Sequence, residues 1–173
     1  NLRDGVESVR ALTDDELVAG GVSPTTLADP RYVKSAAVLE EICPRLPAGD
    51  KQRTLFFDLA DPEKRTVEDI RRALDLIRAF GKYFNVILGL NEKESGEIGK
   101  TLGLNTSDHS PEGLLKLCQA IHQRLRVDTV VVHPTSYALA SGPDGTAIVQ
   151  GPFTPKPKIT TGAGDHFNSG FCL

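Results

Sequence analysis

The feature that most constrains the fold is an alternation of short apolar runs with amphipathic helical segments in the middle of the chain. The apolar runs span Thr54 to Asp58, Asn85 to Leu90 and Asp128 to His133, and each has the length of a strand. Their nearly continuous hydrophobicity is typical of parallel strands that are covered on both faces. Strand, helix, strand, helix, strand therefore predicts an open α/β sheet whose parallel strands are joined by right-handed helical crossovers.

Capping residues mark the helices between these strands. Thr66 predicts the start of a helix whose apolar positions from Ile70 to Phe80 recur at helical spacing, and Gly81 predicts its end. A short helix is expected to end near Gly103, and Ser110-Pro111 opens a longer one. The helices thus fill the intervals that a parallel sheet requires.

The pattern changes after the third strand. A hairpin is predicted from YALA and AIVQ, which the turn SGPDG joins, and FTPKPKI is an extended, proline-broken approach to the last motif. In the first fifty residues a helix is expected over Ala36 to Ile42, whereas GGVSPTTLADP is expected to form a loop.

Composition excludes several classes of function. Charged residues make up 25% of the chain, the net charge is -3, and basic and acidic residues are mixed, so nucleic acid and membrane surfaces are poor partners. No apolar stretch approaches membrane-spanning length. Three cysteines without metal-ligand spacing, Cys43, Cys118 and Cys172, argue against a disulfide framework and favour a reducing cytoplasm.

The ends of the chain are unusual. It begins at Asn1, contains no methionine, and stops at Leu173 soon after the start of a predicted helix. We therefore expect an internal portion of a longer protein, or an incomplete sequence of one.

The segment Gly162 to Asp165 carries the clearest chemical signal. Small residues allow the backbone to approach a ligand closely, and the first N–H groups of a helix have no partners within the helix, so the segment suits an anion. Asp165 beside such a site is placed to act as a base. The alternative is that Asp165 only caps the helix after a glycine turn.

Two other glycine motifs fail on their spacing. Gly99-Lys100-Thr101 resembles the end of a Walker A loop, but Glu94 stands where that loop needs a glycine. A dinucleotide fingerprint starting at Gly162 needs a third glycine at the position of Phe167. Neither nucleotide-binding loop is therefore expected.

The segment TTGAGDHFNSGF, residues 160–171, resembles the second signature of the PfkB carbohydrate kinases, the ribokinase-like family. The resemblance extends to the preceding order of strands and helices, which fits the C-terminal half of that fold. It implies a single ribokinase-like kinase domain over residues 1–173, truncated at both ends, with a three-layer α/β fold around a mostly parallel sheet. It also implies that Asp165 is the catalytic base, that the backbone of Gly162, Ala163 and Gly164 forms an anion hole, and that Thr160 contacts the nucleotide.

A second element agrees with this resemblance. Asn91 to Glu94, NEKE, directly follows a strand and resembles the family motif N-x-x-E, which organises Mg²⁺, its waters and the nucleotide phosphates. The same spacing is a capping box for the helix that it opens, so either role or both are expected. A single carboxylate acting largely through water is sensible for Mg²⁺.

The chain departs from the family pattern at two places. Ile159 stands where the signature usually has an aspartate that helps to hold a monovalent cation, which argues against activation by such a cation. The segment 133–138, HPTSYA, replaces the usual glycine-containing phosphate turn, which implies altered nucleotide binding, with Thr135 or Ser136 as the candidate donor to a phosphate. His133 is expected to be a strand-end residue. FFDLADPEKR, residues 56–65, resembles the strand and turn that the family carries near this point, and the alternative is that Asp58 and Arg65 are only turn residues.

The resemblance thus implies transfer of the ATP γ-phosphoryl group to a hydroxyl of a sugar or nucleoside-like small molecule, with Mg²⁺. A cytoplasmic enzyme is expected, and a homodimer is left open. Two alternatives remain: a vitamin kinase of the same fold, and a non-catalytic ribokinase-like protein that serves binding or regulation.

Overall fold

The structure is a computed structural model that describes residues 13–19, 23–28, 39, 43–46, 53–59, 62–158 and 162–172. The chain forms two compact units, residues 1–48 and 49–173. The first unit contains short helices: α1 (Asp14–Ala19), α2 (Pro24–Leu27) and the 3₁₀ turn η2 (Cys43–Arg45).

The expected loop over residues 20–30 is wrong in part, because α2 lies inside it. Proline is favoured in the first turn of a helix, and here Pro24 directly follows Ser23, whose carbonyl oxygen accepts from the Leu27 N–H at 3.1 Å. The helix expected over residues 36–42 lies outside the described residues, apart from Leu39.

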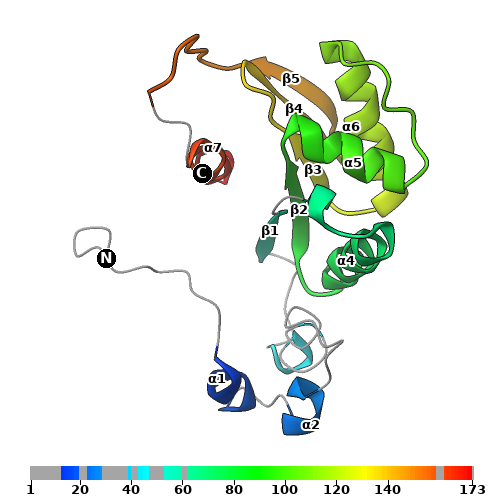
Figure 1. Ribbon diagram of the computed structural model, residues 1–173, viewed down its shortest axis with the longest axis vertical. Coiled ribbons are helices and arrows are strands. Elements are labelled where there is room, and N and C mark those ends of the chain that lie inside the picture. The colour runs from blue at the N-terminus through cyan, green and yellow to red at the C-terminus, as the bar shows by residue number, and fades with distance from the viewer. Residues whose placement is uncertain are drawn as a thin grey trace. The chain divides into compact units, whose positions relative to one another are not determined.

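The second unit is built on a five-stranded sheet whose strands are neighbours in chain order (Figure 1). The strands are β1 (Thr54–Asp58), β2 (Asn85–Leu90), β3 (Thr129–Val132), β4 (Tyr137–Gly142) and β5 (Gly145–Gln150). The helical segments are η3 (Pro62–Lys64), α4 (Val67–Phe80), α5 (Glu92–Thr101), α6 (Pro111–Leu125) and α7 (Ala163–Phe171).

Strand pairing confirms the expected α/β sheet. β1 pairs with β2 and β2 with β3 in parallel, whereas β3–β4 and β4–β5 pair antiparallel, so β4 and β5 form the predicted hairpin. In the parallel part Asp58 is opposite Gly89, and Leu90 is opposite Val132. The three strands β1, β2 and β3 therefore end at one edge of the sheet, which we call the carboxyl edge.

Helices α4, α5 and α6 lie together on one side of the sheet (Figure 1). Phe57 of β1 packs on Phe80 of α4 with ring centroids 5.3 Å apart. Side chains of β2 and the two following helices are fully buried; they include Val86, Leu88, Leu90, Ile98, Cys118 and Ile121. This side supplies the core that fixes the strands.

Gly99 explains why the Walker-like triplet is structural. It lies inside α5, and a Cβ atom at this position would come within 2.8 Å of Leu117 on α6 and 2.7 Å of Thr106. The absence of a side chain therefore lets the two helices approach, and the triplet lies within α5 and not in a loop between a strand and a helix.

Alternation along the strands places a different set of side chains on the opposite face of the sheet. Phe56 points the opposite way from Phe57, and its ring centroid lies 6.3 Å from that of Phe171 in α7. Six residues of β3, β4 and β5 line an apolar pocket of about 450 Å³ against α7, namely Val131, Ala138, Leu139, Ala140, Ala147 and Val149. Helix α7 thus lies against part of the second face. Across the described ranges, no helix has the length and apolar character needed to cross a membrane.

Candidate functional site

The carboxyl edge brings together three polar residues that are distant in the sequence. Asp58 is the last residue of β1, Asn91 follows the last residue of β2, and His133 follows the last residue of β3. The His133 N–H donates to the Leu90 carbonyl at 2.9 Å, which continues the ladder between β2 and β3 past its last strand pair. Ligands of open α/β sheets bind outside the carboxyl ends of the strands, so this edge is the candidate site.

The start of α5 is closed by its own side chains. Asn91 Oδ1 accepts from the Glu94 N–H at 2.9 Å, and Glu94 Oε2 accepts from the Asn91 N–H at 2.8 Å. The predicted capping box is therefore confirmed. Its Glu94 side chain is only 7% exposed, so this carboxylate is held in one place at the edge.

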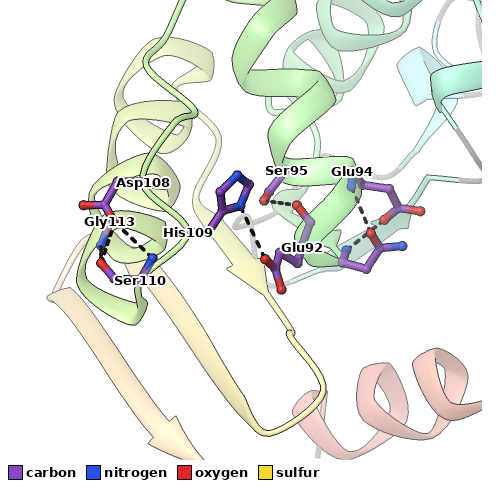
Figure 2. A network of polar contacts seen from close by, with 8 residues as sticks. Glu92, Glu94, Ser95, Asp108, His109, Ser110 and Gly113 are labelled. Atoms are coloured by element: carbon purple, nitrogen blue, oxygen red, sulfur yellow. Dashed lines mark hydrogen bonds and ion pairs between the residues drawn. The ribbon is translucent and has the colours of Figure 1, made fainter.

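Separate polar contacts of Glu92, Ser95 and His109 lie beside this capping box (Figure 2). Ser95 Oγ donates to the Glu92 carbonyl at 2.7 Å, and His109 Nδ1 lies 3.6 Å from Glu92 Oε1. Within the described ranges, no group of three or more His, Cys, Asp and Glu side chains could hold a metal ion. Asn91 and Glu94 both carry side-chain oxygens, the ligand type that Mg²⁺ prefers while it keeps several of its waters.

The start of α7 is built differently. Gly162 is the N-cap, with φ 83° in the left-handed region that favours glycine, and it makes no side-chain capping hydrogen bond. The helix begins at Ala163, so Asp165 lies in its first turn. Within the described part of the chain, no hydrogen bond or ion pair engages the Asp165 carboxylate.

The geometry of this turn keeps the carboxylate near the helix start. Asp165 Oδ2 lies 3.9 Å from the position that a Cβ atom would take on Gly162. His166 Nδ1 bonds the Gly162 carbonyl at 2.8 Å, so the ring nitrogen is the donor. Backbone donors and a carboxylate therefore occupy the same turn, as the anion-cradle hypothesis for residues 162–165 requires.

Aromatic contacts and one hydrogen bond hold α7 against the carboxyl edge. The ring centroids of Phe167 and His133 are 4.7 Å apart, and those of the stacked Phe167 and Phe171 rings are 6.1 Å apart. Asn168 Nδ2 donates to Asp58 Oδ2 at 2.9 Å across 110 residues of chain. The turn that carries Asp165 is thus fastened to the ends of β1 and β3.

His133 is half-buried under this helix. Burial lowers the pKa of its imidazole below the ordinary value, although the nearby Asp58 carboxylate acts in the opposite direction. A Cβ atom on Gly164 would lie 3.9 Å from His133 Cε1. A mainly neutral ring therefore packs beside the first turn of α7.

The remaining predicted residues divide into two groups. Thr135 is exposed in the loop between β3 and β4, next to the carboxyl edge. Thr160 and Ile159 lie outside the described residues.

Sequence reasoning assigned Asp58 to a turn and His133 to a strand end, and it missed their contacts with α7. The one signal in the chain was that both residues follow predicted parallel strands, whose ends meet at one edge.

Comparison with known proteins identifies relatives. A family model described as prokaryotic ketohexokinase matches residues 3–173. The ketohexokinase of Haloferax volcanii is 30% identical over 134 residues, which cover 78% of this chain and 34% of that protein. The chain thus spans about a third of the length of this relative.

A solved structure supports the fold. Phosphofructokinase-2 from Escherichia coli, in complex with substrates and products, matches 94% of this chain and 50% of its own, with a TM-score of 0.51 and 20% identity. A shorter match, 52% identical over 42 residues, is to a component of the phenolphthiocerol/phthiocerol polyketide synthase of Mycobacterium tuberculosis, covering 24% of this chain and 3% of that protein. That share is too small to bear on function.

Proposed function

Because this chain belongs to the prokaryotic ketohexokinase family, which confirms the expected PfkB-type relationship, we propose that it forms the phosphoryl-transfer half of a kinase acting on a ketohexose. ATP is the proposed phosphoryl donor, and a sugar hydroxyl is the acceptor. The observation that carries the proposal is the start of α7, where no side chain caps the helix and the Asp165 carboxylate has no partner among the described residues.

In the proposed reaction Asp165 accepts the proton of the sugar hydroxyl as its oxygen attacks the γ-phosphorus of ATP. The new oxygen–phosphorus bond forms while the bond to the ADP leaving group breaks. The N–H groups of Ala163, Gly164 and Asp165 donate to the oxygens of the transferring group, where negative charge is concentrated. Phosphoryl transfer demands little covalent chemistry from a protein, so positioning and charge are its main contributions.

Residues around this turn would complete the nucleotide site. Asn91 and Glu94 would hold Mg²⁺, mainly through its waters, and Thr135 and Thr160 would donate to phosphate oxygens. When bound, Mg²⁺ supplies neutralisation of phosphate charge. The donor set fits this role because both side chains are oxygen ligands at the carboxyl edge and Glu94 is already held by its cap.

Replacement of the base tests the function. In the full-length protein Asp165→Asn should lower kcat for ketohexose phosphorylation by about 10²- to 10⁴-fold, as expected for loss of a positioned base, with little change in ATP affinity. Asp144→Asn is the matched control, because Asp144 is an exposed carboxylate in the turn between β4 and β5. Phosphorylation by Asp165→Asn at the wild-type rate would contradict the proposal. Ligand affinity without turnover in the wild type would favour a binding protein.

A further inference from the structure

We infer that Asp58 and Asn168 form a positioning pair that sets the rotation of α7 and so aims Asp165; this role rests on the proposed function. The pair is the hydrogen bond from Asn168 Nδ2 to Asp58 Oδ2, 2.9 Å long. Among the described residues it is the one hydrogen bond that joins α7 to the strands. It connects the last residue of β1 to the helix that carries the proposed base.

The spacing of the pair along α7 gives it control over Asp165. Asn168 follows Asp165 by three residues, which places the two side chains one turn apart on the same side of the helix. A rotation or slide of α7 that breaks the bond to Asp58 therefore also displaces the Asp165 carboxylate. Fastening at Asn168 fixes the turn that holds the base.

The other contacts of α7 cannot supply this control. They are apolar and aromatic: Phe167 packs on His133, and Phe171 packs on Phe56. Such contacts accept a broad range of ring geometries, so they hold the helix near the sheet but control its rotation less closely than a hydrogen bond does. A hydrogen bond weakens steeply with angle and distance, and it therefore selects one orientation among those that the aromatic contacts allow.

The Asn168 amide also has a feature that a purely stabilising residue would lack. Its Oδ1 atom is buried without a hydrogen-bond partner, while its Nδ2 atom is used by Asp58. A buried acceptor without a donor is unfavourable, so an apolar side chain here would cost the fold less. The amide is therefore best explained by the one bond that it donates.

Exchange of the two side chains tests the pair in the full-length protein. Asn168→Asp places a second carboxylate against Asp58, so the two side chains repel each other and the hydrogen bond is lost. We expect kcat to fall by about 10- to 100-fold, because small misplacements of a reacting group have effects of this size. KM for the sugar and for ATP should stay within about threefold, since the change displaces the carboxylate and N–H groups that act on the transferring group and leaves Asn91 and Glu94 in place. Asp58→Asn keeps an oxygen acceptor and should retain most of the activity.

The double variant Asp58→Asn with Asn168→Asp again pairs one amide with one carboxylate. The amide donor now stands at position 58 and the carboxylate acceptor at position 168. We expect kcat to recover to within about threefold of the wild-type value, measured per folded molecule. A double variant as slow as Asn168→Asp alone, or an Asn168→Asp enzyme with wild-type kcat, would overturn the pair. If Asn168→Asp does not fold, Asp58→Ala decides, because Asp58 is exposed and its truncation should still lower kcat with KM unchanged.

The outcomes separate the pair from the proposed function. If the wild type is active, Asp165→Asn is inactive and Asn168→Asp is unaffected, the positioning role of Asp58 and Asn168 is refuted. The kinase assignment then remains. A wild type that phosphorylates no ketohexose removes the assignment and the role of the pair with it.

Discussion

Helices α5 and α7 begin near the same edge of the sheet, yet their first turns are built in opposite ways. The first turn of α5 is satisfied by the reciprocal bonds of Asn91 and Glu94, and its helix is anchored by fully buried side chains such as Ile98. The first turn of α7 starts at Gly162 without a side-chain cap, and none of its described side chains is buried. A closed turn serves the fold, whereas an open turn leaves backbone donors for a ligand.

The same difference extends to the two faces of the sheet. The face under α4, α5 and α6 is packed with residues that are inaccessible to solvent. The face under α7 retains an apolar pocket of about 450 Å³, and Phe171 is 37% exposed. Close packing thus belongs to the helices on the first face, whereas α7 is loosely packed, and the following substitutions test that difference.

Matched truncations of the two helices should give the largest difference. Ile98→Ala in α5 removes a side chain with 0% exposure and should lower the free energy of unfolding by about 2 to 5 kcal/mol. Phe171→Ala in α7 should cost about 1 kcal/mol, because this ring is already partly solvated. Urea unfolding of the full-length variants measures both values. Equal costs would mean that α7 is as firmly anchored as α5.

The capping box should separate into a structural part and a metal-binding part. Asn91→Ala should lower the free energy of unfolding by about 0.5 to 2 kcal/mol, since it removes the cap. Glu94→Gln keeps the bond to the Asn91 N–H and should change stability by less than about 0.5 kcal/mol. It removes the charge, however, and should raise the Mg²⁺ concentration for half-maximal activity by about tenfold. An unchanged Mg²⁺ requirement would leave Glu94 with a capping role alone.

His133 should give the smallest effect, visible as a pH dependence. Burial lowers its pKa in the folded state, so the unfolded state binds more protons just below the ordinary value of 6.5. Its contribution to stability is therefore present above pH 6.5 and is lost as the pH falls through the lowered folded pKa. His133→Phe keeps an aromatic ring against Phe167 and has no group that titrates. The Tm of this variant should therefore fall less than the wild-type Tm as the pH is lowered below 6.5. A variant with the wild-type pH profile would contradict a buried, mainly neutral His133.

Much of the fold was predictable because it depends on local rules. Strands β1 to β3, the caps Thr66, Asn91 and Ser110, and the β4–β5 hairpin all follow from apolar runs, capping residues and turn residues close together in the chain. The family was also predictable, since residues 160–171 carry a specific motif. The loop assigned to residues 20–30 failed because one turn of helix leaves little periodicity in a sequence.

The sequence by itself determined which residues carry the proposed chemistry, because Asp165 and its small neighbours form a contiguous motif. Only the tertiary structure decided what holds them in place. Asp58 and Asn168 are 110 residues apart and meet only because β1 is parallel to β2 and α7 returns to the edge where β1 ends. Contacts of this kind depend on strand order and helix docking, and no local pattern in the chain records them.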